Sequence, residues 1–84
     1  MVQVEIKNKA GLHARPAAQF CTLVKKYSAK ITITKSEKSF DAKSVLMIMS
    51  AGIEYGDQIT IEAVGSDARQ AEEELAAFLN TLED

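Results

Sequence analysis

His13 is the only histidine in the 84-residue sequence, and its neighbours suit chemistry at phosphorus. Gly11, two residues before His13, ends the alternation of apolar and polar residues at the start of the chain. Pro16 lies three residues after His13. Proline suits the first position of a helix, where its missing N–H would be unpaired anyway. The free N–H groups and dipole at such a position favour an anion, and a neutral imidazole is a nucleophile. This context favours a phosphoryl-accepting histidine over an ordinary surface side chain.

Arg15 lies two residues after His13 and supplies a cation for the same anion. A guanidinium can bind two phosphate oxygens at once. If the helix starts at Pro16, its first free amide donors come from Ala17, Ala18 and Arg15. Together these groups would hold a phosphoryl group on a ring nitrogen without a metal.

Other kinds of site find little support in the sequence. One histidine and one cysteine, Cys21, cannot form a metal-ligand cluster of familiar spacing or a disulfide framework. Cys21 falls on the apolar side of the first expected helix, which favours a buried structural thiol. The sequence has neither a Walker-type phosphate loop nor a recognisable carboxylate pair. We therefore expect no metal and no cofactor.

Charge and hydropathy restrict the location and the partners. The net charge of −2 gives no electrostatic argument for binding nucleic acid. Nine of the ten basic residues precede position 45, and the last expected helix is acidic. Both can be solvated faces, or the basic half can meet an acidic partner, and charge alone leaves both interpretations open. The N-terminus lacks the pattern of a signal peptide, and no apolar stretch reaches the length of a membrane span, so we expect a cytoplasmic protein without membrane insertion.

Hydrophobic periodicity predicts four strands and three helices in the order βαββαβα. Apolar and polar residues alternate in the strands, and apolar residues recur at helical spacing in the two longer helices. The expected strands are residues 2–7, 31–34, 39–42 and 59–63, and the expected helices are 16–28, 45–51 and 68–82. The fold class is therefore α+β: three helices cover one face of a four-stranded, mostly antiparallel sheet and leave the other face to water. We expect a single domain over residues 1–84.

Capping residues mark the ends of the two later helices. Ser44 can cap the second helix, and Gly52 can end it in the left-handed conformation that favours glycine. Asp67 and Gln70 have the spacing of a capping box at the start of the last helix. A turn is expected at residues 36–38.

The short second helix has more apolar residues than one buried face can use. We assign Val45 and Ile48 to the core. The side chains expected on an exposed docking surface beside His13 are Leu46, Met47, Met49 and, from the first helix, Phe20.

Two motifs resemble a known family. Residues 11–17, Gly-Leu-His-Ala-Arg-Pro-Ala, closely resemble the active-site motif of HPr, the histidine-containing phosphocarrier of the bacterial phosphoenolpyruvate-dependent phosphotransferase system. Residues 43–52 resemble that family's second motif, and the likeness covers essentially the whole chain.

The resemblance implies the open-faced β-sandwich fold of that family, and it implies a carrier rather than an enzyme. His13 would accept a phosphoryl group on Nδ1 from phosphorylated enzyme I and pass it to an enzyme IIA domain during sugar uptake. Arg15 would neutralise the group, and amide donors of Arg15 and Ala17 would complete its binding site. The family's partner surface lies in the region of the expected docking residues, and we expect a monomer.

Ser44 matches the regulatory serine of many members of this family. In those members HPr kinase/phosphorylase modifies the serine, which slows phosphorylation of the histidine and recruits a transcriptional regulator. The alternative is that Ser44 is only a helix cap. Met47 replaces the small residue often found there, which leaves recognition by the kinase open.

Three functions follow from these patterns. The first is the carrier of sugar uptake, and the second is a regulatory paralogue that serves a phosphorelay without transporting sugar. Both share the histidine motif, and the serine-containing second motif leans toward the first. The third is a binding module in which His13 is inert.

Overall fold

The fold is described from a computed structural model, which describes residues 1–82. Seven elements follow in the predicted order: β1 (Val2–Glu5), α1 (Ala14–Val24), β2 (Lys30–Lys35), β3 (Lys38–Asp41), α2 (Val45–Ser50), β4 (Gln58–Val64) and α3 (Ala68–Asn80). The predicted α+β fold class is confirmed. Every predicted element is present; the starts of β1, α2 and α3 are as predicted, and the other boundaries differ by one to four residues.

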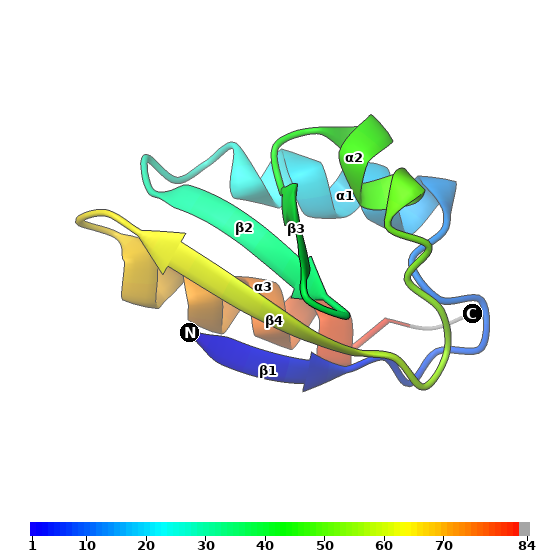
Figure 1. Ribbon diagram of the computed structural model, residues 1–84. Helices are drawn as coiled ribbons and strands as arrows, with labels where there is room; N and C mark the ends of the chain where they lie inside the picture. Colours follow the sequence, from blue (N-terminus) through cyan, green and yellow to red (C-terminus); the bar gives the residue numbers. More distant parts are fainter. Residues whose placement is uncertain (83–84) are drawn as a thin grey trace.

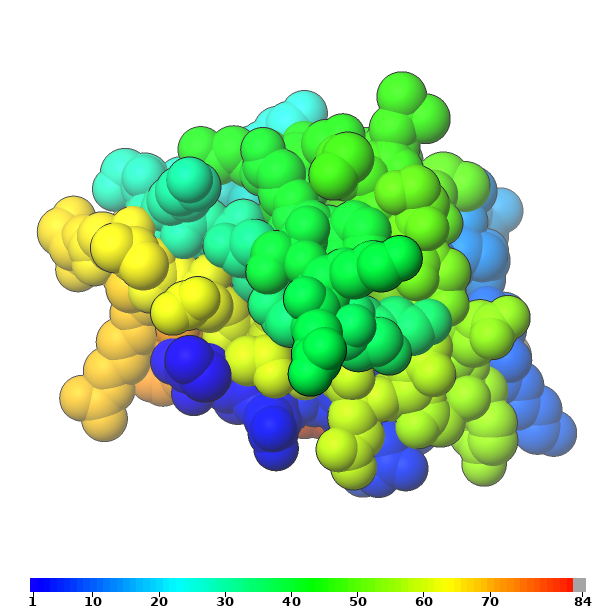
Figure 2. All heavy atoms as spheres, in the orientation of Figure 1, coloured from blue at the N-terminus to red at the C-terminus, as the bar shows by residue number. Residues whose placement is uncertain are grey.

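The four strands form one antiparallel sheet in the order β1-β4-β2-β3 (Figure 1). Val4 pairs with Ile59, and Ile33 pairs with both Ile61 and Phe40. β4 and β2 are central, so β1 and β3 are the two edges. α1 and α3 lie behind the sheet in Figure 1, and α2 packs against α1 and β3. Figure 2 therefore looks onto the uncovered, polar face of the sheet.

The core lies between the sheet and the helices. Alternate strand residues point into it, which is what the period of two predicts. The fully buried aliphatic side chains of the strands are Ile31, Ile33, Ile59 and Ile61, and those of the helices include Val24, Ile48, Leu75 and Leu79. Cys21 is buried among them as predicted, and burial raises the pKa of its thiol.

The first helix differs from its predicted range at both ends. It begins at Ala14 because the Ala17 N–H donates to the His13 carbonyl (2.9 Å), so Pro16 is the third helical residue rather than the first. It ends at Val24 instead of Ser28. The backbone N–H groups of Ser28 and Ala29 donate to the Asp67 carboxylate (2.9 Å each), which takes them out of the helical hydrogen-bond pattern.

The same carboxylate explains why the predicted capping box is wrong. Asp67 is the N-cap residue of α3, but its side chain makes no capping hydrogen bond to that helix. Its two oxygens are occupied by the α1–β2 connection instead. The caps of α2 are confirmed: Ser44 Oγ accepts from the Met47 N–H (3.2 Å), and Gly52 has φ +62°.

Candidate functional site

The connection between β1 and α1 fixes the backbone in front of His13. Asn8 is 6% exposed, and its Nδ2 donates to the Gly11 carbonyl (2.7 Å) while the Gly11 N–H donates to the Asn8 carbonyl (3.1 Å). Gly11 has φ +65°, and a Cβ there would lie 2.6 Å from the Ile53 carbonyl oxygen. Only glycine fits this position. Leu12 is buried, and its N–H donates to the same Ile53 oxygen (3.0 Å).

Sequence reasoning missed Asn8. Its place in the sequence, three residues before a turn glycine, was the available signal, because asparagine side chains often bond to the backbone of a nearby turn. Its Oδ1 is buried without a hydrogen-bond partner among residues 1–82.

His13 is the N-cap residue of α1 and is exposed. Its backbone is extended (φ −80°, ψ −171°), and its side chain makes no capping hydrogen bond. The imidazole is thus presented at the start of the helix, where reagents can reach it.

The amide donors beside His13 differ from the predicted set. The first turn of a helix leaves its N–H groups without an intrahelical acceptor. In α1 these belong to Ala14 and Arg15, because Pro16 has no N–H and Ala17 already donates to His13. The Arg15 N–H is available as predicted. The prediction for Ala17 is wrong because its N–H already donates to the His13 carbonyl, and the Ala14 N–H is available in its place.

The Arg15 side chain is exposed and forms no ion pair within the part of the chain that the structure describes. It stands on the first turn of α1, whose dipole is positive at that end. An uncompensated guanidinium, two amide donors and an imidazole therefore gather at one exposed helix start. Such a group can bind a dianion and offer it a nitrogen nucleophile.

The second motif forms α2, which contacts α1 and lies over its N-terminal half in Figure 1. Ile48 is fully buried and Val45 is partly buried against the core, as predicted. Leu46, Met47 and Met49 are 81%, 41% and 44% exposed, which confirms their predicted exposure. We call these three residues the α2 patch. Their role in docking stays a prediction.

The prediction for Phe20 is wrong. Phe20 is 0% exposed, and its ring lies 6.2 Å from that of Phe78 on α3. It belongs to the buried stripe of α1 with Ala17, Cys21 and Val24, so it faces the sheet and α3 rather than a partner.

The described residues contain neither a cluster of metal-ligating side chains nor a membrane-spanning helix. No three His, Cys, Asp or Glu side chains within residues 1–82 come together in a way that could hold a metal ion. Among the same residues, no helix combines the length and the hydropathy needed to cross a membrane.

A family model described as the PTS HPr component phosphorylation site matches residues 2–81. The chain belongs to the HPr family. It is 44% identical over 80 residues to the phosphocarrier protein HPr of Vibrio cholerae, covering 95% of this chain and 94% of that protein. It is 43% identical over 77 residues to the HPr-like protein Crh of Halalkalibacterium halodurans, covering 92% of each.

Solved HPr structures share the fold. The crystal structure of HPr-C-His from Thermoanaerobacter tengcongensis superposes with a TM-score of 0.91 at 41% identity, covering 95% of this chain and 90% of that one. Membership of the HPr family makes this chain a phosphoryl carrier that acts with other proteins of the phosphotransferase system.

Proposed function

We propose that His13 carries the phosphoryl group, accepting it from enzyme I and donating it to an enzyme IIA domain. The observation that supports this assignment is the position of His13: an exposed imidazole at the N-cap of α1, followed two residues later by an arginine that forms no ion pair within residues 1–82. The His13 Nδ1 lone pair forms a bond to phosphorus. The bond from phosphorus to its donor on enzyme I breaks, and its electron pair leaves with the donor. The second transfer reverses these roles.

Arg15 and the first amides of α1 hold the phosphoryl oxygens during both transfers. The guanidinium offsets their charge, and the N–H groups of Ala14 and Arg15 lie at the positive end of the helix dipole. His13 stays exposed because two partners must reach it in turn. The α2 patch supplies apolar contact area beside it.

We infer that the chain does no chemistry beyond carrying the group. It works as a monomeric, single domain over residues 1–84 in the cytoplasm, without a cofactor. The exposure of His13 supports a group that is passed between proteins rather than one that reacts in an enclosed pocket.

Incubation with enzyme I and phosphoenolpyruvate tests the assignment. We expect one phosphoryl group per chain, labile in acid and stable in alkali, and none on His13→Ala with unchanged circular dichroism. An uncharged wild-type chain, under conditions that charge a known HPr, would contradict the carrier role. Label that remains on His13→Ala would contradict the choice of residue.

Ser44 is proposed as a regulatory site for HPr kinase/phosphorylase, with a transcriptional regulator as the partner of the modified form. Its Oγ accepts the Met47 N–H and its side chain is partly exposed. A phosphate at this position would place negative charge beside the α2 patch and repel an acidic partner. Incubation with the kinase and ATP tests this proposal, and Ser44→Ala must abolish the label.

A regulatory role without sugar transport is the second candidate, and the 43% identity to Crh favours testing it. Deleting the gene for this chain separates the two. Loss of sugar uptake supports the transport carrier, whereas unchanged uptake supports the regulatory role.

A further inference from the structure

Residues 52–57, in the connection from α2 to β4, bond to both ends of residues 6–13, the segment between β1 and α1 that we call the histidine loop. At one end the Ile6 N–H donates to the Asp57 carbonyl (2.8 Å). At the other end the Leu12 N–H donates to the Ile53 carbonyl (3.0 Å). In Figure 2 the yellow-green segment lies directly against the blue segment that leads into α1. The position of the residue before His13 therefore depends on where this connection is held.

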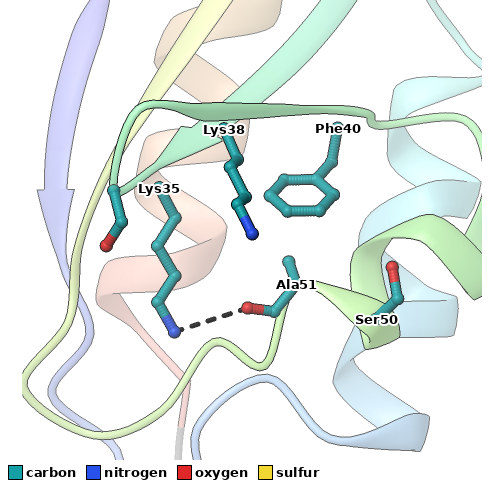
Figure 3. Close-up of a pocket in the computed structure, with 6 residues that line it drawn as sticks. Lys35, Lys38, Phe40, Ser50 and Ala51 are labelled. Carbon is teal, nitrogen blue, oxygen red and sulfur yellow. Dashed lines mark hydrogen bonds between the residues drawn. The ribbon is translucent and has the colours of Figure 1, made fainter.

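Lys35, at the end of β2, holds the connection at its base. Its Nζ donates to the Gly52 carbonyl (2.5 Å) and to the Ala51 carbonyl (3.4 Å), where the connection begins. The same Nζ pairs with Asp57 Oδ2 (2.8 Å), where the connection ends. Figure 3 shows the lysine side chain extended toward Ala51. One ammonium group thus joins both ends of the segment.

Asp57 completes this closure. Its Oδ2 also accepts the Glu54 N–H (2.7 Å), and its own N–H donates to the Glu54 carbonyl (3.0 Å). The Lys35 side chain, followed by the Glu54 N–H, lowers the pKa of the Asp57 carboxyl. Both members of the pair are largely shielded, with 20% and 28% of their side-chain surfaces exposed. Shielded pairs with added hydrogen bonds are less weakened by solvent and salt than fully exposed ones.

We propose that Lys35 is a positioning residue for His13, acting through Gly52 and Asp57 on the Ile53 carbonyl and so on Leu12. The inference rests on the proposed role of His13 as the phosphoryl acceptor. Among residues 1–82, the hydrogen bonds and the ion pair of Lys35 go to Ala51, Gly52 and Asp57, and none goes to His13 or to the α2 patch. Its removal lowers the rate of transfer by letting the histidine loop move, because small displacements of a reacting group slow a reaction strongly.

Lys38 provides a matched control. It lines the same surface hollow as Lys35, together with Ser36, Phe40, Ser50 and Ala51. It is exposed, and in the described residues it makes neither an ion pair nor a hydrogen bond to the connection. Lys38→Met therefore removes the same charge and the same kind of side chain without releasing residues 52–57.

The experiment compares Lys35→Met, Lys35→Arg and Lys38→Met in the full chain. Amide hydrogen exchange reports the loop directly at the N–H groups of Leu12 and Gly56, the second of which donates to the Ile6 carbonyl (2.8 Å). Ile61 in the sheet is the internal reference. Charging by enzyme I and phosphoenolpyruvate gives kcat and KM for the carrier as substrate. Lys35→Met should exchange faster at Leu12 and Gly56 but not at Ile61, and should lose roughly tenfold in kcat with KM unchanged.

Rescue distinguishes positioning from general stability. Lys35→Arg keeps the cation and should restore most of the rate and the protection, and Lys38→Met should match the wild type. Equal acceleration of exchange at Leu12 and Ile61 would overturn the proposal, since it shows global destabilisation. So would faster exchange at Leu12 with unchanged kcat, or a Lys38→Met chain as slow as Lys35→Met. A wild-type chain that enzyme I does not charge would instead overturn the proposed function, whatever the exchange at Leu12.

Discussion

The charged side chains along α3 and those at the start of α1 differ in how many partners they have. On α3, Glu72 accepts from the N-terminal amine (2.7 Å) and from the Ala63 N–H (2.9 Å). Glu74 accepts from the Tyr27 hydroxyl and pairs with Lys26 (2.9 Å). Each of these carboxylates joins α3 to a different part of the chain, so its charge is used to hold the fold.

At the start of α1 the polar groups have no such partners within the described residues. His13 and Arg15 are exposed, and neither takes part in the ion pairs of residues 1–82. Leu46, on the helix α2 that packs against α1, is 81% exposed. The fold gains little from these three side chains. Groups left without partners in an ordered framework are available to a ligand, and the following substitutions test this contrast.

The largest effect is expected for Arg15→Ala. We expect the rate of His13 phosphorylation to fall about a hundredfold, the usual scale for losing one charged or hydrogen-bonding group at a transition state. The thermal midpoint should stay within a few degrees, because Arg15 supports no other residue in the described structure. Quenching the reaction at successive times, with limiting enzyme I, and counting the phosphoryl label on the chain measures the rate.

Arg69→Ala is the control for Arg15. It removes another exposed arginine, whose one ion pair among residues 1–82 is a long one with Glu73 (3.9 Å) on the same helix. Its charging rate should match the wild type. Equal losses in the two variants would show that net charge, rather than the position beside His13, sets the rate.

A smaller effect is expected for Leu46→Ser in the α2 patch. Burying a leucine against a partner contributes about 1.5–3 kcal/mol, so KM for enzyme I should rise about tenfold or more while kcat changes little. Val64→Ser, at the end of β4, removes an aliphatic side chain that is 67% exposed. Its KM should not change. A Leu46→Ser chain with wild-type KM would remove the α2 patch from the docking surface.

The smallest effect is expected on the thermal midpoint in acid, where the hydrogen-bonded carboxylates of α3 and its N-cap become protonated. The Ser28 N–H, ahead of the Ala29 N–H, lowers the pKa of Asp67, and hydrogen bonds likewise lower the pKa of Glu72 and Glu74. A carboxyl whose folded pKa is lowered contributes stability above its unfolded pKa, about 4, and loses it as pH falls through the folded pKa. The thermal midpoint should therefore fall as the pH drops below about 4, the unfolded pKa of these carboxyls.

Asp67→Asn tests one of these contributions. It should lower the midpoint at pH 7 and reduce its further fall in acid, whereas Glu73→Gln, on the exposed side of α3, should do neither. Calorimetry at pH 7 and in acid measures the thermal midpoint of each variant. An unchanged acid response would mean that Asp67 does not help to hold the α1–β2 connection.

Sequence patterns succeed here where the cause is local. Alternation around Ile31 and Ile33 locates a strand because the strand period is local, and Ser44 and Gly52 mark α2 because caps act within one turn. His13 is found for the same reason, since its neighbours in sequence are its neighbours in space.

The failures have a distant cause. The Asp67 side chain does not form the expected capping box because its oxygens accept from the Ser28 and Ala29 amides, which lie 39 and 38 residues away in the sequence. Pro16 is not the first helical residue because the loop before α1 places the His13 carbonyl where it accepts a hydrogen bond from the Ala17 N–H. Lys35 carries no local pattern that would connect it to Gly52 or Asp57. These features depend on which surfaces meet in the folded chain.

The central claim is that His13 carries the phosphoryl group, and nuclear magnetic resonance of the ring nitrogens tests it most directly. A chain labelled with ¹⁵N in histidine, charged by enzyme I and phosphoenolpyruvate, contains a single imidazole. We predict a phosphorus–nitrogen coupling at Nδ1 and none at Nε2, with the signal disappearing when an enzyme IIA domain is added. A charged chain in which the coupling is absent, or lies at Nε2, would contradict the account.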